Sequence, residues 1–346
     1  MKCLVTSLYG NSIVTASPDG TIIVWDAERG TVSQEWFAHQ RGVHALALSS
    51  DGRRLVSAGG DRTLVVWDIS NGVHEAVLTE RRAHLLAACA WSPDGALIAL
   101  ALSDKTVRIR DARTFEQRDM LEYQGFDGID EPLRFSPDSR YLAWRTQRHG
   151  SMLGCRIWRP TSGEQPKELL VPSPLHGRVF VAALSFDPQS TRIATAHGSL
   201  DRQENVVRIW DIATGTVLAE LAGHETAVTD VSFSPNGESI LSASCDGSAK
   251  IWDAKDGREK VSLQVGGPTY IVPKACFSPD GKYVATASVD GTVRLWRVAD
   301  GSLVAVSAEH SVLVMDATFS SDSKFLVSGD LTGVVCIRPV SAFTGH

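Results

Sequence analysis

The apolar and polar residues alternate in short runs that predict β-strands. Residues 227–233 (AVTDVSF) alternate and predict a first strand, and SPNG supplies a turn. SILSAS (239–244) predicts a second strand, and CDGS is a tight hairpin. AKIWD (249–253) and EKVSLQ (259–264), separated by the turn KDGR, predict a third and a fourth strand. Residues 224–264 therefore predict one sheet of four antiparallel strands.

This pattern recurs along the chain, with an aromatic slot near the end of each third strand. The slot is occupied by Trp25, Trp67, Arg110, Trp158, Trp210, Trp252, Trp296 and Arg338. The steps between them are 42, 43, 48, 52, 42, 44 and 42 residues. A period near 42 residues is typical of propeller blades. Third strands such as TIIVWD (21–26) are apolar on both faces, as stacking between neighbouring sheets requires.

We therefore predict an all-β fold, a β-propeller of four-stranded antiparallel blades in a single domain over residues 1–346. Eight blades are expected, with seven blades and one degenerate outer repeat as the alternative. The expected blades cover residues 1–37, 38–80, 81–122, 123–171, 172–221, 222–264, 265–307 and 308–346.

The repeats resemble those of the WD-repeat β-propeller family, with a bacterial look in their SPDG-rich copies. The resemblance implies a structural tetrad of His, Ser or Thr, Asp and Trp in each repeat. Two complete copies are expected, one at His39, Ser57, Asp61 and Trp67, and one at His224, Ser242, Asp246 and Trp252. The physical chemistry agrees, since the Asp accepts from the imidazole, and the hydroxyl bonds both the imidazole and the indole N–H.

Six copies are incomplete. The first has Thr15, Asp19 and Trp25 without a preceding His, and we expect His346, which matches the His slot at the end of the chain, to complete it. The third has Leu100 and Arg110 in the hydroxyl and Trp slots, and the fourth has Trp144 in the hydroxyl slot. The fifth has His176, Thr195 and Trp210 with an enlarged hairpin, and His197 is assigned no role. The seventh has Thr286, Asp290 and Trp296 with Pro268 in the His slot. The eighth has His310 and Ser328, with Thr332 in the Asp slot and Arg338 in the Trp slot.

Two hairpins are enlarged, and the first lies in a segment with an excess of arginine. They are TQRHGSMLG (146–154) and HGSLDRQEN (197–205), and residues 140–159 hold five Arg and no acidic residue. Arginine suits carboxylate and phosphate groups. We expect this region to bind an acidic or phosphorylated peptide through Phe126, Arg145, Arg148, His149 and Arg202, the alternative being solvated loops whose Arg residues pair with acids of the chain.

Composition and motifs reduce the number of functions that the sequence favours. A net charge of −6 gives no general attraction to nucleic acid, so we do not expect nucleic acid as a partner. No apolar run is long enough for a membrane span. The six cysteines form no CxxC pair, so we expect reduced thiols in a cytoplasmic protein and no metal. We find no catalytic or phosphate-binding motif and expect no enzyme activity and no cofactor.

The expected function is a non-catalytic protein–protein interaction scaffold. The alternatives are a ligand-sensing or regulatory domain of a larger signalling or defence polypeptide and, third, a propeller enzyme.

Overall fold

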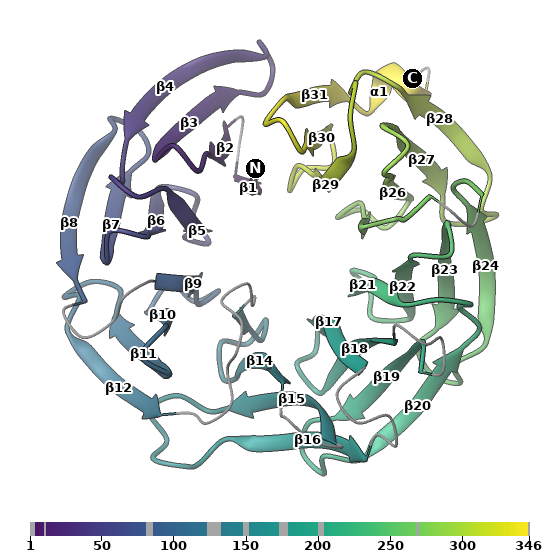
Figure 1. The fold of residues 1–346 in the computed structure, drawn as a ribbon, viewed down its shortest axis with the longest axis horizontal. Helices are drawn as coiled ribbons and strands as arrows, with labels where there is room; N and C mark the ends of the chain where they lie inside the picture. Colours follow the sequence, from purple (N-terminus) through teal and green to yellow (C-terminus); the bar gives the residue numbers. More distant parts are fainter. Residues whose placement is uncertain are drawn as a thin grey trace. The chain divides into compact units, whose positions relative to one another are not determined.

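The computed structural model describes residues 4–9, 12–80, 86–122, 133–147, 152–172, 179–199, 204–267 and 270–344. Its strands form eight antiparallel sheets, numbered here one to eight in chain order, and within each sheet the strands follow the order of the chain (Figure 1). The all-β prediction and the expectation of eight sheets are confirmed.

The first four sheets contain β1 to β16. Their bounds are β1 (Leu4–Tyr9), β2 (Ser12–Ala16), β3 (Thr21–Asp26) and β4 (Thr31–Phe37); β5 (Val43–Leu48), β6 (Arg54–Gly59), β7 (Thr63–Asp68) and β8 (Val73–Thr79); β9 (Leu86–Trp91), β10 (Leu97–Leu102), β11 (Thr106–Asp111) and β12 (Gln117–Glu122); β13 (Arg134–Phe135), β14 (Leu142–Gln147), β15 (Met152–Trp158) and β16 (Lys167–Pro172).

The last four sheets contain β17 to β31. Their bounds are β17 (Val179–Phe186), β18 (Arg192–Ser199), β19 (Val206–Asp211) and β20 (Val217–Ala222); β21 (Val228–Phe233), β22 (Ser239–Ser244), β23 (Ser248–Asp253) and β24 (Glu259–Gln264); β25 (Lys274–Phe277), β26 (Tyr283–Ala287), β27 (Val293–Arg297) and β28 (Leu303–Ser307); β29 (Val314–Phe319), β30 (Phe325–Asp330) and β31 (Val335–Pro339).

The eighth sheet differs from the prediction of four strands in every blade. It has three strands in the described residues, and a short helix, α1 (Ser341–Thr344), follows β31 directly. Phe343 of this helix packs against the apolar cluster that sheets seven and eight share. This single helical turn is held by the Phe343 and Thr344 N–H groups, which both donate to the Val340 carbonyl oxygen. This helix, the only one in the described ranges, is too short to cross a membrane.

The chain divides into two compact units, one of residues 1–144 and 157–166 and the other of residues 145–156 and 167–346. Within each unit the core lies between successive sheets. In the first unit, Val24 of sheet one packs with Leu55, Val65 and Trp67 of sheet two. In the second unit, a cluster between sheets five and six includes Ile209 and Trp252. Successive sheets of a unit thus bury the faces that they share, as the apolar third strands predict.

A register shift places the aromatic slot in the same way in several sheets. The pairing of the third and fourth strands shifts just before Trp67, Trp210 and Trp252, so that Trp67 lies opposite His74 and Trp252 lies opposite Glu259. A bulge of this kind adds a residue and bends one strand. The same fourth-strand position therefore lies beside each indole, which makes the sheets directly comparable.

Candidate functional site

The first tetrad is a continuous hydrogen-bonded chain in sheet two. His39 Nδ1 lies 3.0 Å from Asp61 Oδ1, and His39 Nε2 lies 2.8 Å from the Ser57 hydroxyl oxygen. The Trp67 indole N–H donates to the same hydroxyl oxygen over 2.9 Å. All contacts are satisfied when Nδ1 donates to the carboxylate and Nε2 accepts from Ser57.

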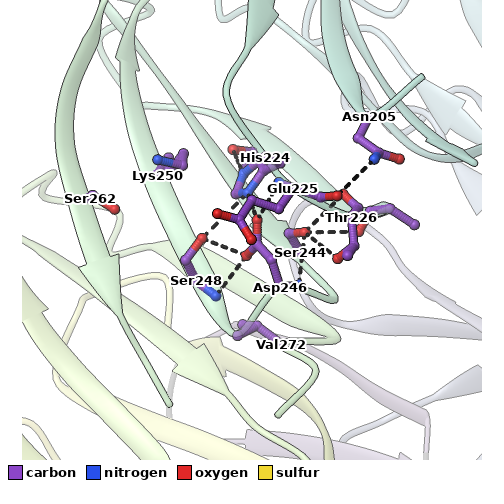
Figure 2. Close-up of polar contacts among 12 residues, drawn as sticks. Asn205, His224, Glu225, Thr226, Ser244, Asp246, Ser248, Lys250, Ser262 and Val272 are labelled. Carbon is purple, nitrogen blue, oxygen red and sulfur yellow. Dashed lines mark hydrogen bonds and ion pairs between the residues drawn. The ribbon is translucent and has the colours of Figure 1, made fainter. Parts of the chain in front are cut away.

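The second tetrad repeats this geometry in sheet six, and two of its members, His224 and Asp246, are labelled in Figure 2. His224 Nδ1 lies 2.8 Å from Asp246 Oδ2, and His224 Nε2 lies 2.7 Å from the Ser242 hydroxyl. The Trp252 indole N–H donates to Ser242 over 2.8 Å. Ser248 donates to Asp246 Oδ1 through both its backbone N–H and its hydroxyl. Both complete sets named from the sequence are thus brought together.

Burial and hydrogen bonding set the charges in these chains. Burial lowers the pKa of His39, against the opposing effect of Asp61. Burial raises the pKa of Asp61, but donation from Thr63, the Gln40 N–H and His39 outweighs it and lowers the pKa overall. The pKa of Asp246 is held below its usual range in the same way, where donation from His224 outweighs burial. Each imidazole is fully engaged between a carboxylate and a hydroxyl, so the arrangement connects strands and leaves no reactive group open.

In sheet eight, the residue assigned to the Asp slot from the sequence, Thr332, is wrong. His310 Nε2 lies 2.8 Å from the Ser328 hydroxyl, but His310 Nδ1 lies 3.0 Å from Asp330, two residues before the Thr332 expected in the Asp slot. Asp330 Oδ1 accepts from the N–H and hydroxyl of Thr332, as Asp61 does from Thr63. The Asp-x-Thr turn has moved by two residues while its carboxylate still reaches the imidazole.

Sheet five contains a second residue that the sequence analysis missed. His197 in β18 is fully buried, and its Nε2 lies 2.8 Å from the Thr195 hydroxyl, which also accepts from the Trp210 indole over 2.8 Å. His197 therefore supplies the contact to the hydroxyl that His39 and His224 make in the complete tetrads. His176, the residue expected there, lies outside the described residues. Burial, assisted by the nearby Arg208 charge, lowers the pKa of His197 to about 3.

An arginine in the Trp slot is paired with a glutamate near the His slot. In sheet three, Glu80 is only 2% exposed and accepts from Arg110 over 2.6 Å and from Arg108. In sheet eight, Arg338 makes a two-pronged contact with Glu309. The Arg–Glu pair thus replaces the indole in both sheets. The sequence signal was a Glu shortly before the His slot, 30 residues before Arg110 and 29 before Arg338.

The other incomplete copies keep part of the chain of contacts. Trp25 donates to Thr15 over 2.9 Å, and Trp296 donates to Thr286 over 2.9 Å. In sheet seven, Arg294 donates to Asp290 over 2.8 Å, where a histidine would otherwise bind. In sheet one, Asp19 accepts from Thr21, and the expected closure by His346 falls outside the described residues. The pKa of Asp19 is lowered by donation from the Thr21 hydroxyl.

The predicted arginine-rich region is only partly described. Arg145 is half-buried and donates to the carbonyls of Val181 (3.0 Å) and Ala182 (3.4 Å) in β17. Arg156 pairs with Glu168 over 2.5 Å. Both contacts connect strands of the second unit. The remaining candidates, Phe126, Arg148, His149 and Arg202, lie outside the described residues.

The cysteines show no sign of a metal or redox site where the chain is described. Five of them, Cys89, Cys155, Cys245, Cys276 and Cys336, are free thiols. Burial raises the pKa of Cys89, Cys155 and Cys276 to about 12, which keeps these thiols protonated. Across the described ranges, no group of three His, Cys, Asp or Glu side chains is placed to hold a metal ion.

The repeats match the family described as WD domain, G-beta repeat. The matches cover residues 2–26, 30–68, 76–111, 215–253, 263–297 and 301–337, more than half of the chain. The chain therefore belongs to this family of β-propeller repeat proteins. The unmatched stretch, 112–214, contains the two enlarged hairpins.

Relatives share the repeats at modest identity. The chain is 34% identical over 164 residues to WD repeat-containing protein SL1-17 of Schistosoma mansoni, covering 47% of the chain and 49% of that protein. It is 28% identical over 271 residues to nuclear distribution protein PAC1 of Arthroderma benhamiae, covering 70% and 56%. The chain spans about half the length of these relatives. Both are eukaryotic, so the bacterial look of the repeats has no support here.

One solved structure resembles nearly the whole chain. The computationally designed Ika8 protein superposes with a TM-score of 0.78 at 24% identity, covering 98% of this chain and 97% of that one. At this identity the likeness concerns the fold alone. Members of the family that the repeats match generally bind proteins or peptides.

Proposed function

We propose that this protein is a non-catalytic scaffold that binds other proteins through the loops and sheet edges of its propeller. The main support for this proposal is the set of hydrogen bonds that the repeat histidines make. His39, His224 and His310 are each held between a carboxylate and a hydroxyl as part of the repeat, so the His–Asp–Ser sets build sheets and do not perform chemistry.

An acidic or phosphorylated peptide is the partner we propose for the enlarged hairpins. The support is the arginine content of residues 140–159 and the isolation of this region from the regular repeats. Because Arg145 and Arg156 already contact β17 and Glu168, we assign the binding itself to Arg148, His149 and Arg202, with Phe126 as an apolar contact.

Charge reversal tests this proposal. Full-length protein carrying Arg148→Glu and Arg202→Glu should lose affinity for a phosphoserine-rich acidic peptide by about tenfold or more, measured by fluorescence anisotropy. The matched control carries Arg29→Glu and Arg258→Glu, two arginines that are 80% and 83% exposed on regular turns. Equal binding by the two variants would contradict the assignment, as would absence of binding by the unmodified protein.

We also propose a cytoplasmic location, because the free thiols of the five described cysteines suit a reducing compartment. Fluorescence microscopy of the tagged full-length protein tests this, and a signal confined to a secretory compartment would refute it.

A further inference from the structure

An open pocket of about 450 Å³ lies on sheet two, where the end of β4 meets β7 and β8. We call it the Trp67 pocket. Phe37 and Val77 form apolar walls, Val65 and Trp67 line the pocket beside them, and Asp61 and Gln40 supply polar atoms. All of these residues belong to the first unit, and the proposal below concerns a second binding site, separate from the enlarged hairpins.

The walls of the Trp67 pocket present unusual apolar surface. Phe37 is 65% exposed and Val77 is 52% exposed, although Phe37 directly follows Trp36, which packs against the core of sheets one and two, and Val77 lies opposite the buried Val65. The Trp67 ring is fixed, because it stacks on Trp36 with 5.2 Å between ring centroids and donates its N–H to Ser57. The pocket is therefore preformed, and an alkyl chain placed in it would cover Phe37 and Val77.

In sheet six, side chains of the protein itself fill the position that corresponds to the Trp67 pocket. Two residues before Trp252 stands Lys250, whose ammonium lies 5.9 Å from the indole centroid and pairs with Glu259 over 2.7 Å. Glu259 is the residue opposite Trp252 across the strands. The lysine stem thus lies along the indole with its charge held at the edge of the sheet, and Figure 2 labels Lys250 beside the polar contacts of His224.

Sheet two has the same complete tetrad but lacks this lysine–glutamate pair. Val65 stands two residues before Trp67, and His74 lies opposite Trp67. The tetrad carboxylate is therefore more exposed in sheet two: the Asp61 side chain is 17% exposed, whereas that of Asp246 is 7% exposed. A carboxylate that faces an apolar, indole-lined pocket suits an incoming cation.

We propose that the Trp67 pocket binds a lysine or arginine side chain of a partner protein. The stem packs between Phe37 and Val77 alongside Trp67, and the cationic head reaches Asp61, whose Oδ2 otherwise accepts only from the Gln40 N–H in the described residues. A net charge of −6 favours the approach of a basic segment.

The test uses full-length protein with ¹⁵N-labelled tryptophan and the peptide acetyl-Gly-Lys-Gly-amide. The indole N–H signals of Trp36 and Trp67 should shift on titration. The same peptide with norleucine in place of lysine keeps the stem and lacks the charge, and it should bind about tenfold more weakly because it gains neither the Asp61 contact nor the cation–π interaction. Equal affinity for the two peptides, or no shift with either, would overturn the proposal.

Variants connect the binding to this pocket. Val65→Lys with His74→Glu copies the sheet-six pair into sheet two, and it should abolish the shifts by filling the pocket. The control Val32→Lys with Val73→Glu makes a similar change at exposed positions of β4 and β8 outside the pocket, and it should bind the lysine peptide as the unmodified protein does. Retained binding in the first variant, or loss in the second, contradicts the proposal.

If the filled variant does not fold, as judged by circular dichroism, Phe37→Ser decides the question. Phe37 is mostly exposed, so this change leaves the core intact and should weaken binding of the lysine peptide about fivefold through loss of one apolar wall. Unchanged affinity in this variant would refute the proposed site.

Discussion

At the scale of single residues, the polar chains show how far sequence spacing predicts contacts. The complete tetrads were readable because His39 and His224 have the same separations, 18 residues to the serine and 22 to the aspartate. The role of Asp330 was not predicted, because Asp330 lies 20 residues after His310 instead of 22. The role of His197 was not predicted, because the contact with the threonine hydroxyl is made by an imidazole from β18 itself. What the fold requires is a polar atom at a point in space, which several backbone positions can supply.

The two arginines in Trp slots give a prediction on stability. Glu80→Ala should lower the free energy of unfolding by about 3–5 kcal/mol, because it leaves the charges of Arg108 and Arg110 buried without their shared partner. Glu309→Ala removes the corresponding pair in sheet eight, where Glu309 is 36% and Arg338 is 47% exposed, and it should cost less than about 1 kcal/mol. Urea denaturation of both variants measures the difference, and equal costs would show that burial does not distinguish the pairs.

His197 gives a prediction on pH. Its folded-state pKa, about 3, lies below the value of 6.5 for a free histidine, so the unfolded chain takes up a proton at a higher pH than the folded chain. Stability supplied by the neutral imidazole is therefore complete above pH 6.5 and falls as pH decreases from 6.5 towards 3. His197→Gln should reduce the loss of thermal stability between pH 7 and pH 4.5, whereas His44→Gln, at an exposed position, should not. An unchanged pH profile in His197→Gln would contradict this assignment.

At the scale of elements, the strand pattern was predicted well because each sheet is built from local turns and alternation. Asp-Gly and SPDG turns mark hairpins directly; at the CDGS hairpin, for example, Gly247 has a φ of +83° and a Cβ there would meet the Gly267 carbonyl oxygen at 2.3 Å. The three-stranded form of sheet eight in the described residues was not predicted, since the repeat pattern implies a fourth strand after β31, where Ser341–Thr344 form a helical turn.

Sheet four gives a prediction at this scale. A Cβ on Gly154 of β15 would lie 1.7 Å from the Leu169 carbonyl oxygen of β16, so Gly154→Ala must push these paired strands apart. We expect a loss of about 3 kcal/mol in unfolding free energy, with faster hydrogen exchange in β15 and β16. Gly163→Ala is the control, because its Cβ meets nothing within 4 Å and only its φ of +76° opposes the change, at about 1 kcal/mol. Equal effects of the two changes would contradict the close approach of the strands.

At the scale of the whole molecule, the repeats determine the class of protein, and the two proposed binding sites relate to the repeats in different ways. Six repeats match the family, and the unmatched stretch 112–214 contains the two enlarged hairpins, the first of which lies in an arginine-rich segment. The Trp67 pocket lies instead in one of the most regular repeats. Val65 stands at a position that is cationic in sheets three to seven, as Lys250 and Arg294 illustrate, but the pocket is not evident from the sequence because it forms only where the end of β4 meets β7 and β8.

The central claim is that this protein binds partner proteins through surfaces carried on a rigid repeat fold. Its most direct test is quantitative affinity capture from an extract of the source cells with three full-length baits: the unmodified protein, the hairpin variant Arg148→Glu with Arg202→Glu, and the pocket variant Val65→Lys with His74→Glu. With thermal stability matched among the baits, each variant should lose at least one partner that the other retains. Identical sets of captured proteins for all three baits would contradict the account.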